Sequence, residues 1–311
     1  MSSHTPDIYF PNLGISLERV PRFLIGNDPD LSLIHLSFMP LNIYLYAAFI
    51  VVGITLAALI GFYYVHVSGQ NVSDYVDLLI VGVVLAFIGL RSYYLFFNWD
   101  QFRGQPILRT FFQFRDGGLA IYGGIIGAAA AALIMSRYKK IPFRVMADAG
   151  APSMLLGQAI GRWGNFFNRE AFGGYTDGLF AMRIRVDQAH ITNPELFDTA
   201  LVFMNDTPYF QVHPTFFYES ALNFVYMIAL ILYRPHKRFN GEIVLLYFLG
   251  YGVFRFFIEG LRMDQMIFFG TGLPLNQITS LLFVAVSILL LVIGHLKASK
   301  QAPTPVSRRK K

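Results

Sequence analysis

The sequence predicts an all-α integral membrane protein with seven transmembrane helices. Three observations support this fold class. The 311 residues are 55% hydrophobic and only 14% charged, whereas a soluble domain carries about a quarter charged residues. Several apolar runs reach the roughly 20 residues that a helix needs to cross a bilayer. The runs are continuous rather than alternating, which favours helices over a β-barrel.

The apolar runs divide the chain into five regions. They are an external N-terminal arm (1–39), the first four spans (40–167), an external head segment (168–213), the last three spans (214–296) and a basic cytoplasmic tail (297–311). We expect the spans at about 40–65, 74–96, 118–136, 145–167, 214–233, 242–260 and 276–296. The third span is rich in glycine and alanine, which let neighbouring helices approach closely.

Loop charge predicts the orientation. The loops 136–144 and 233–242 and the C-terminal tail are strongly basic, and basic loops stay in the cytoplasm. The N-terminus is therefore expected outside, and the C-terminus in the cytoplasm. The N-terminal arm lacks the apolar core of a signal peptide and resembles an amphipathic surface segment.

The head segment is the longest connection, and we expect a small external head domain between the fourth and fifth spans. Its stretch "GLFAMRIRVD" alternates apolar and polar residues like a short strand. The following "TNPELFD" predicts a turn leading into a helix.

The composition also limits the chemistry. Without cysteine, the chain itself offers no disulfide, thiolate metal site or thioester. The net charge of +6 is concentrated in short loops and the tail "SRRKK", which indicates a topology signal rather than nucleic-acid binding. No HExxH or paired aspartate-rich motif is present, so we expect neither a metal nor a cofactor.

Polar residues gather at the predicted outer ends of six spans. A charged side chain in the bilayer centre costs roughly 3 kcal/mol or more, so such residues usually face a cavity or a partner. From the first span to the sixth they are Tyr46; Arg91; Tyr122; Arg162 and Asn165; His213, Tyr218 and Glu219; and Tyr251, Arg255, Glu259 and Arg262.

Helical spacing predicts which of these side chains share a face. In the sixth span, Arg255 and Glu259 are four residues apart and are expected to orient each other. Arg162, Asn165 and Arg169 share a face if their helix persists. Arginines outnumber acids in the predicted cluster, so we expect an anionic ligand, and at this depth a phospholipid headgroup.

Each residue also has a purely structural interpretation. Arg262 is also explained as an anchor that reaches the headgroups, and His213 as a helix-start residue. Tyr44 and Trp163 are typical of an aromatic belt. For the arginines and their acidic neighbours, the structural alternative is a polar network between helices.

The stretch "GRWGNFFNREAFGG" (161–174) resembles the signature of bacterial prolipoprotein diacylglyceryl transferases. "DGGLAIYGGIIGA", "HPTFFYES", "GYGVFRFFIE" and "LPLNQITS" resemble further blocks of that family in the same order, from about residue 38 to 296. The resemblance implies a multi-pass enzyme of the bacterial plasma (inner) membrane, expected as a monomer, with its active site toward the outer leaflet. It would carry out the first step of lipoprotein maturation.

The implied reaction moves the diacylglyceryl group of phosphatidylglycerol, a co-substrate, to the lipobox cysteine of a preprolipoprotein. A thioether forms and glycerol 1-phosphate leaves. The chain's polar residues and the resemblance together assign a catalytic set: Tyr46, Tyr122, Arg162, Asn165, Glu170, Arg255 and Glu259. The expected substrate-binding set is Arg91, Arg162, Gly173, His213, Tyr218, Glu219, Tyr251 and Arg262.

The base that removes the thiol proton stays open among Glu170, Tyr122, His213 and water. Some family members have histidine where this chain has Tyr122. A tyrosine, with an ordinary pKa near 10, is a poor base at neutral pH. Two other functions also stay open: a transporter or binding protein with an arginine-lined phosphate or lipid site, and a structural or lipid-sensing membrane protein.

Overall fold

The structure is a computed structural model that describes residues 5–36, 42–113, 117–268 and 270–301. It contains two compact units. The first comprises Met1–Ala57 with Ala151–Lys311, and the second comprises Ala58–Gly150. The boundaries between the units fall within two helices, α1 (Leu45–Val67) and α6 (Phe143–Asn168). The basic tail predicted for 297–311 lies largely outside the described residues.

The protein is mostly helical, as predicted. Among the described residues, six helices are long and apolar enough to cross a membrane. They are α1, α2 (Val72–Phe97), α5 (Ile121–Tyr138), α8 (Thr215–Tyr233), α9 (Glu242–Leu261) and α10 (Leu275–Gln301). The predicted fourth span is α6, which is also long enough at 26 residues. Its polar residues, among them Asp148 and Arg162, keep it out of the apolar group.

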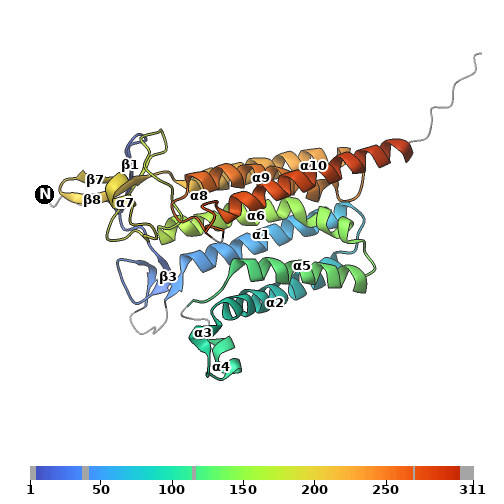
Figure 1. Cartoon of the computed structure of the whole chain (residues 1–311), viewed down its shortest axis with the longest axis horizontal. Coiled ribbons are helices and arrows are strands. Elements are labelled where there is room, and N and C mark those ends of the chain that lie inside the picture. Colours follow the sequence, from blue (N-terminus) through green and yellow to red (C-terminus); the bar gives the residue numbers. More distant parts are fainter. Residues whose placement is uncertain (1–4, 37–41, 114–116, 269, 302–311) are drawn as a thin grey trace, which may run out of the picture. The chain divides into compact units, whose positions relative to one another are not determined.

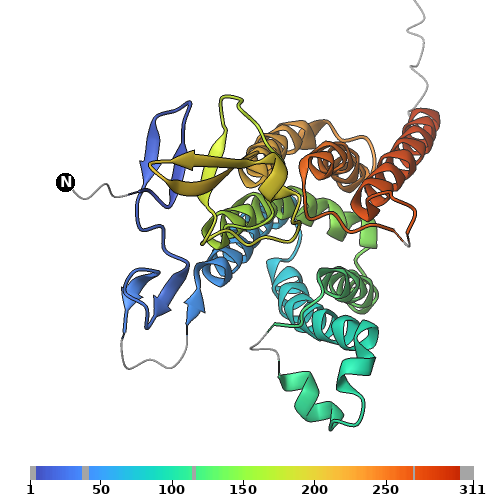
Figure 2. The same cartoon turned by 60° about the vertical axis from the view of Figure 1, so that its left-hand side comes forward.

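The first unit contains a five-stranded antiparallel sheet (Figure 2). Its order is β2 (Ile15–Leu17), β1 (Ile8–Phe10), β6 (Met182–Arg185), β8 (Thr207–Val212) and β7 (Leu201–Met204). The alternating stretch of the head segment forms β6, as predicted. The predicted turn and helix are also present, since α7 spans Leu196–Thr199. The N-terminal arm supplies β1 and β2 to the same sheet.

A second sheet precedes the first membrane helix. It has three strands in the order β4 (Ser32–His35), β3 (Phe23–Gly26) and β5 (Ile43–Tyr44). The pair β3–β4 is parallel, and β3–β5 is antiparallel. Because β5 ends directly where α1 begins, this sheet fixes the entry of α1.

The five-stranded sheet and the helix ends share one hydrophobic core. Ile8 of β1, Ile184 of β6 and Phe210 of β8 are buried together with Phe166 of α6 and Phe216 of α8. Burying such side chains contributes about 1.5–3 kcal/mol each. This core therefore holds the polar end of α6 against the beginning of α8, where the candidate site lies.

Helices α8, α9 and α10 pack side by side in sequence order (Figure 1). A short 3-10 turn, η1 (Arg234–His236), follows α8. Gly53 of α1 lies against the backbone of Gly157 of α6, so these two helices also approach closely. The helices that carry the candidate site thus belong to one compact unit.

The second unit is built on the packing of α2 against α5, with the short helices α3 (Trp99–Phe102) and α4 (Ile107–Phe112) between them in sequence. Gly89 of α2 faces Gly123 and Gly127 of α5 so closely that a Cβ at any of them would overlap the opposite backbone. This confirms the predicted use of small residues. Lys139, after α5, pairs with Asp74 and Asp77 of α2 at 2.9 and 2.5 Å.

Candidate active site

The candidate site begins where α6 ends. The helix stops at Asn168, because Arg169 adopts a left-handed φ of +53° and Ala171 one of +58°. No glycine is present at either position, although glycine is the usual residue for this conformation. Arg169 was predicted to share a face with Arg162 and Asn165 if the helix persisted, and this condition is not met because α6 ends before Arg169.

A chain of hydrogen bonds connects the last turn of α6 to the loop that follows. Arg162 Nη1 donates to Asn165 Oδ1 at 3.3 Å. Asn165 Nδ2 donates to Glu170 Oε1 at 2.9 Å, and Asn168 Nδ2 donates to the same oxygen at 3.3 Å. Two side-chain amides thus orient the Glu170 carboxylate toward the helix that carries Arg162.

Glu219 of α8 lies between two arginines. Its Oε1 is 2.8 Å from Nη2 of Arg162, and its Oε2 is 3.1 Å from Nη1 of Arg255. The Glu219 side chain is 2% exposed, whereas that of Arg162 is 22% exposed. One buried carboxylate therefore holds guanidinium groups from α6 and α9 together, and leaves Arg162 partly accessible.

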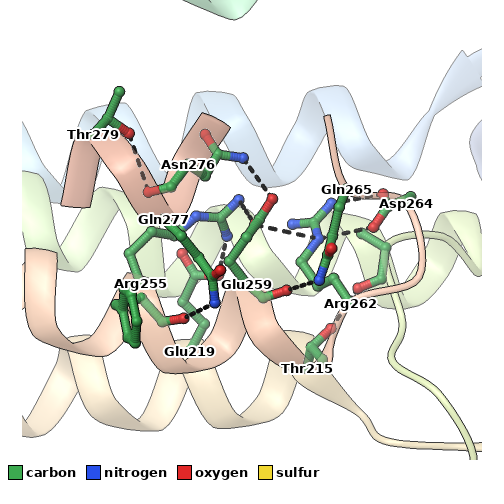
Figure 3. Close-up of polar contacts among 12 residues, drawn as sticks. Thr215, Glu219, Arg255, Glu259, Arg262, Asp264, Gln265, Asn276, Gln277 and Thr279 are labelled. Carbon is green, nitrogen blue, oxygen red and sulfur yellow. Dashed lines mark hydrogen bonds and ion pairs between the residues drawn. The ribbon is translucent and has the colours of Figure 1, made fainter. Parts of the chain in front are cut away.

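A second buried carboxylate, Glu259, completes the network (Figure 3). Its Oε2 is 2.7 Å from Nη2 of Arg255, which confirms the predicted i,i+4 pair on α9. Its Oε1 accepts a 2.8 Å hydrogen bond from Asn276 Nδ2 of α10. The Glu259 side chain is 1% exposed, and a buried carboxylate of this kind requires such partners.

Arg262 at the end of α9 forms a bidentate pair with Asp264, with distances of 2.9 and 2.7 Å (Figure 3). Arg262 Nε is also 4.0 Å from Glu259 Oε2. Burial raises the pKa of Asp264, but the hydrogen bonds and charge of Arg262 outweigh burial and hold this pKa below its usual range. Arg262 is thus directed toward the network by an ionised partner.

Two tyrosines complete the surroundings of Arg162. Tyr251 of α9 lies near Arg162 and interacts with it electrostatically. Tyr46 of α1 interacts electrostatically with both Arg162 and Glu170. The ring of Tyr46 lies where a Cβ on Gly164 would be, so this glycine makes room for it.

Carboxylates outnumber arginines in this network, contrary to expectation. The three arginines Arg162, Arg255 and Arg262 are matched by Glu219, Glu259 and Asp264, and Glu170 adds a further carboxylate. The prediction that arginines outnumber acids is therefore wrong for the cluster that forms. Paired arginines still have free donors, because each guanidinium carries five N–H groups.

Three other predicted residues lie where separate segments meet. Gly173 N donates to His213 O at 3.0 Å, and Gly174 N donates to Leu261 O at 3.1 Å. A Cβ at Gly173 would overlap Leu261 O and His213. His213 Nδ1 is 3.5 Å from the Tyr218 hydroxyl, and burial lowers the pKa of His213. Their roles in substrate binding stay predictions.

The second unit holds Arg91 and Tyr122. Arg91 is buried, and its guanidinium donates to the carbonyls of Thr110, Phe111, Gln113, Gly117 and Gly118 at 2.6–3.5 Å. Tyr122 packs beside Tyr93, with ring centroids 6.3 Å apart. The roles of Arg91 in substrate binding and of Tyr122 in catalysis stay predictions. Arg91 thus joins the end of α4 to Gly117 and Gly118, which precede α5.

An apolar pocket of about 520 Å³ opens between α1, α6 and α8. Trp163, the neighbour of Arg162 in sequence, contributes to its wall. The other lining residues are Phe49, Leu156, Ala159, Ile160, Phe217, Ser220, Ala221 and Phe224. Trp163 Nε1 donates to Ser220 Oγ at 3.2 Å, which satisfies both polar groups in an otherwise apolar wall.

Sequence reasoning missed the contribution of α10. Asn276 contacts Glu259, and its neighbour Gln277 donates to the Phe256 carbonyl at 3.2 Å. Gln265 donates to the Glu259 carbonyl at 2.6 Å. The motif "LPLNQITS" was the available signal, since two amides at the start of an apolar helix need polar partners.

The sequence is similar to one family and to named relatives. The family model described as prolipoprotein diacylglyceryl transferase matches residues 33–293. A phosphatidylglycerol–prolipoprotein diacylglyceryl transferase of Bacillus cytotoxicus is 35% identical over 279 residues, which cover 87% of this chain and 94% of the relative. The protein of that name from Shouchella clausii is 35% identical over 262 residues, covering 83% and 88%.

Proposed function

Because this chain belongs to the prolipoprotein diacylglyceryl transferase family, we propose that it transfers the diacylglyceryl group of phosphatidylglycerol to the lipobox cysteine of a preprolipoprotein. The family assignment makes the protein a transferase. One observation supports the substrate assignment most directly: buried Glu219 holds Arg162 beside Arg255, with Arg162 partly exposed. Two adjacent guanidinium groups suit a phosphodiester.

The proposed reaction is a displacement at carbon. The cysteine thiolate attacks the glyceryl carbon that bears the phosphate ester, so a C–S bond forms as the C–O bond breaks. The electron pair of that bond leaves with the oxygen of glycerol 1-phosphate. Arg162 and Arg255 offset the charge on the leaving phosphate, as preorganised donors do in other active sites.

The thiol proton passes to a base that stays open among Glu170, Tyr122, His213 and water. Glu170 has the clearest support, because Asn165 and Asn168 orient its carboxylate and Asn165 also accepts a hydrogen bond from Arg162. A positioned base typically contributes 10²–10⁴-fold to a rate. No metal and no cofactor take part in the proposed chemistry.

The membrane setting follows from the same residues. We propose that α6 also crosses the membrane, which makes seven spans in all, and that its polar residues face the site rather than lipid. The basic loops then keep the C-terminus in the cytoplasm, and the candidate site lies toward the outer leaflet of the bacterial plasma membrane.

The apolar pocket between α1, α6 and α8 gives an acyl chain a place beside Trp163. Both substrates would enter laterally from the bilayer.

A direct test uses the purified protein in detergent–lipid micelles with a lipobox peptide and labelled phosphatidylglycerol. The expected result is a labelled peptide whose mass increases by the diacylglyceryl group, and a peptide with Cys→Ser as control stays unlabelled. The Arg162→Ala variant should give no labelled peptide while it stays folded. Binding of phosphatidylglycerol without any transfer would instead favour the lipid-binding alternative.

A further inference from the structure

Asp7 of the N-terminal arm contacts the loop that follows α6, at Arg169. Asp7 precedes β1 and is buried. Its Oδ2 accepts a 2.9 Å hydrogen bond from Val20 N and lies 3.6 Å from Arg169 Nη2. Its Oδ1 accepts a 2.8 Å hydrogen bond from Gln188 Nε2. The family match begins only at residue 33, so this contact comes from a segment outside it.

Arg169, the partner of Asp7, is an unusual residue for its position. It is 1% exposed and has a left-handed φ of +53°, a conformation that disfavours residues with a Cβ. Its Nη2 donates to Val20 O at 2.5 Å, and its Nη1 donates to Phe167 O at 3.2 Å. Burial lowers the pKa of Arg169 to about 10, and the charge of Asp7 opposes this effect.

Glu170 directly follows this buried arginine. Its amide donates to Asn165 O at 3.1 Å, so its backbone folds back on the end of α6. The next residue, Ala171, also has a positive φ, and its carbonyl accepts a hydrogen bond from Thr215. Glu170 thus lies between two backbone conformations that need support from outside the loop. On the Arg169 side, the support comes from the arm.

We propose that Asp7 of the N-terminal arm, acting through Arg169, is a positioning residue that holds the Glu170 carboxylate against Asn165 and Asn168. Both members of the Asp7–Arg169 pair are buried, so they act on the site through the backbone of the loop. The pair fixes the peptide on which Glu170 sits, and residues 5–32 therefore serve the site as well as the sheet. The expected loss of transfer activity rests on the proposed function. The expected loosening of the backbone around Glu170 does not.

The structural consequence is tested by hydrogen–deuterium exchange of peptides that cover residues 165–174. The variants are Asp7→Asn and Arg169→Gln, because each removes one charge of the pair while residue 169 keeps a Cβ at its positive φ. Exchange in these peptides should rise at least tenfold, as expected when one partner of a buried ion pair is removed. The matched control is Asp198→Asn, since Asp198 is an exposed carboxylate on α7 of the head segment. Unchanged exchange in both variants would overturn the inference.

The kinetic consequence is tested in the transfer assay. Both variants should lower kcat about tenfold and leave KM for phosphatidylglycerol unchanged, because a misplaced group costs rate rather than binding. In a Glu170→Gln background, the same substitutions should cost no further activity, because they act through the lost carboxylate. Equal losses in both backgrounds would contradict a positioning role. Absence of transfer by the wild-type protein would contradict the proposed function. In that case the hydrogen–deuterium exchange result would still show whether the Asp7–Arg169 pair holds the loop.

Discussion

Glu219 Oε1 lies 2.8 Å from Arg162 Nη2, and this contact joins α8 to the signature helix α6. The same carboxylate also binds Arg255 at 3.1 Å. Replacing it by glutamine leaves two guanidinium groups without their shared anion. We expect Glu219→Gln to abolish transfer and to lower the free energy of unfolding by about 3–5 kcal/mol.

The measurement for Glu219→Gln combines transfer of labelled lipid with denaturant unfolding in detergent. Glu18→Gln is the control, because Glu18 is an exposed carboxylate of the N-terminal arm. It should change unfolding by less than about 0.5 kcal/mol. Full activity in Glu219→Gln would show that the carboxylate is not needed to hold the arginines.

Asn276, which was not predicted as a site residue, should be needed for full transfer activity. Its amide supports the buried Glu259 at 2.8 Å, so Asn276→Ala leaves a carboxylate oxygen with one partner fewer. We expect kcat to fall about tenfold and stability to fall by about 1–3 kcal/mol. Thr279→Val, one turn along α10, is the control, because Thr279 bonds only the Asn276 carbonyl among the contacts drawn in Figure 3. Equal kcat values for the two variants would refute the prediction.

Gly161 and Gly164 offer a matched pair on one helix. A Cβ on Gly164 would overlap the Tyr46 ring, whereas a Cβ on Gly161 would meet nothing within 4 Å. Gly164→Ala should destabilise the protein by about 1–3 kcal/mol through overpacking and should reduce transfer. Gly161→Ala should be neutral or stabilising by up to about 1 kcal/mol, because alanine favours a helix. Thermal unfolding of both variants provides the comparison, and equal shifts would mean that Tyr46 moves aside at no cost.

Replacing Arg91 by alanine distinguishes a structural role of this residue from a role in substrate binding. Five backbone carbonyls accept hydrogen bonds from its guanidinium. Arg91→Ala should leave them without this donor and should lower the unfolding free energy by more than about 3 kcal/mol. Proteolysis within residues 103–113 should accelerate as well. A raised KM for phosphatidylglycerol at unchanged stability would instead support the substrate-binding prediction.

His213 should make stability depend on pH. Burial lowers its pKa in the folded protein, so below its ordinary value near 6.5 the unfolded chain binds a proton that the folded chain does not. This contribution to stability is complete above about pH 6.5 and is lost as the pH falls from there through the folded pKa. His213→Gln should flatten the fall in melting temperature between pH 6.5 and 5. An identical slope in both proteins would exclude His213 as its source.

The sequence predicted the helices better than the segments outside them. Apolar runs placed α8 and α9 within a residue or two of their observed bounds, because a bilayer allows few alternatives to a continuous helix. The N-terminal arm was harder to interpret. Its strands are only three or four residues long, and β1 depends on pairing with β6 more than 170 residues later. A pattern within 1–39 does not contain that information.

The site was predictable where spacing on one helix decides contact. The Arg255–Glu259 pair followed from a separation of four residues. Pairing between helices was not predictable in the same way, so Glu219 was expected to bind substrate and its two arginine contacts were not expected. The end of α6 before Arg169 was not predicted, because a positive φ at a residue other than glycine gives no local signal.

The matching of each arginine to a carboxylate bears on how the enzyme would release its product. A cluster of bare guanidinium groups would retain a dianionic phosphate monoester long after the bond had broken. Here Glu219, Glu259 and Asp264 already compete for the same N–H donors. In the proposed reaction, these carboxylates would bind the N–H donors again as glycerol 1-phosphate dissociates. The resting contacts would therefore favour release of the product and binding of the next lipid.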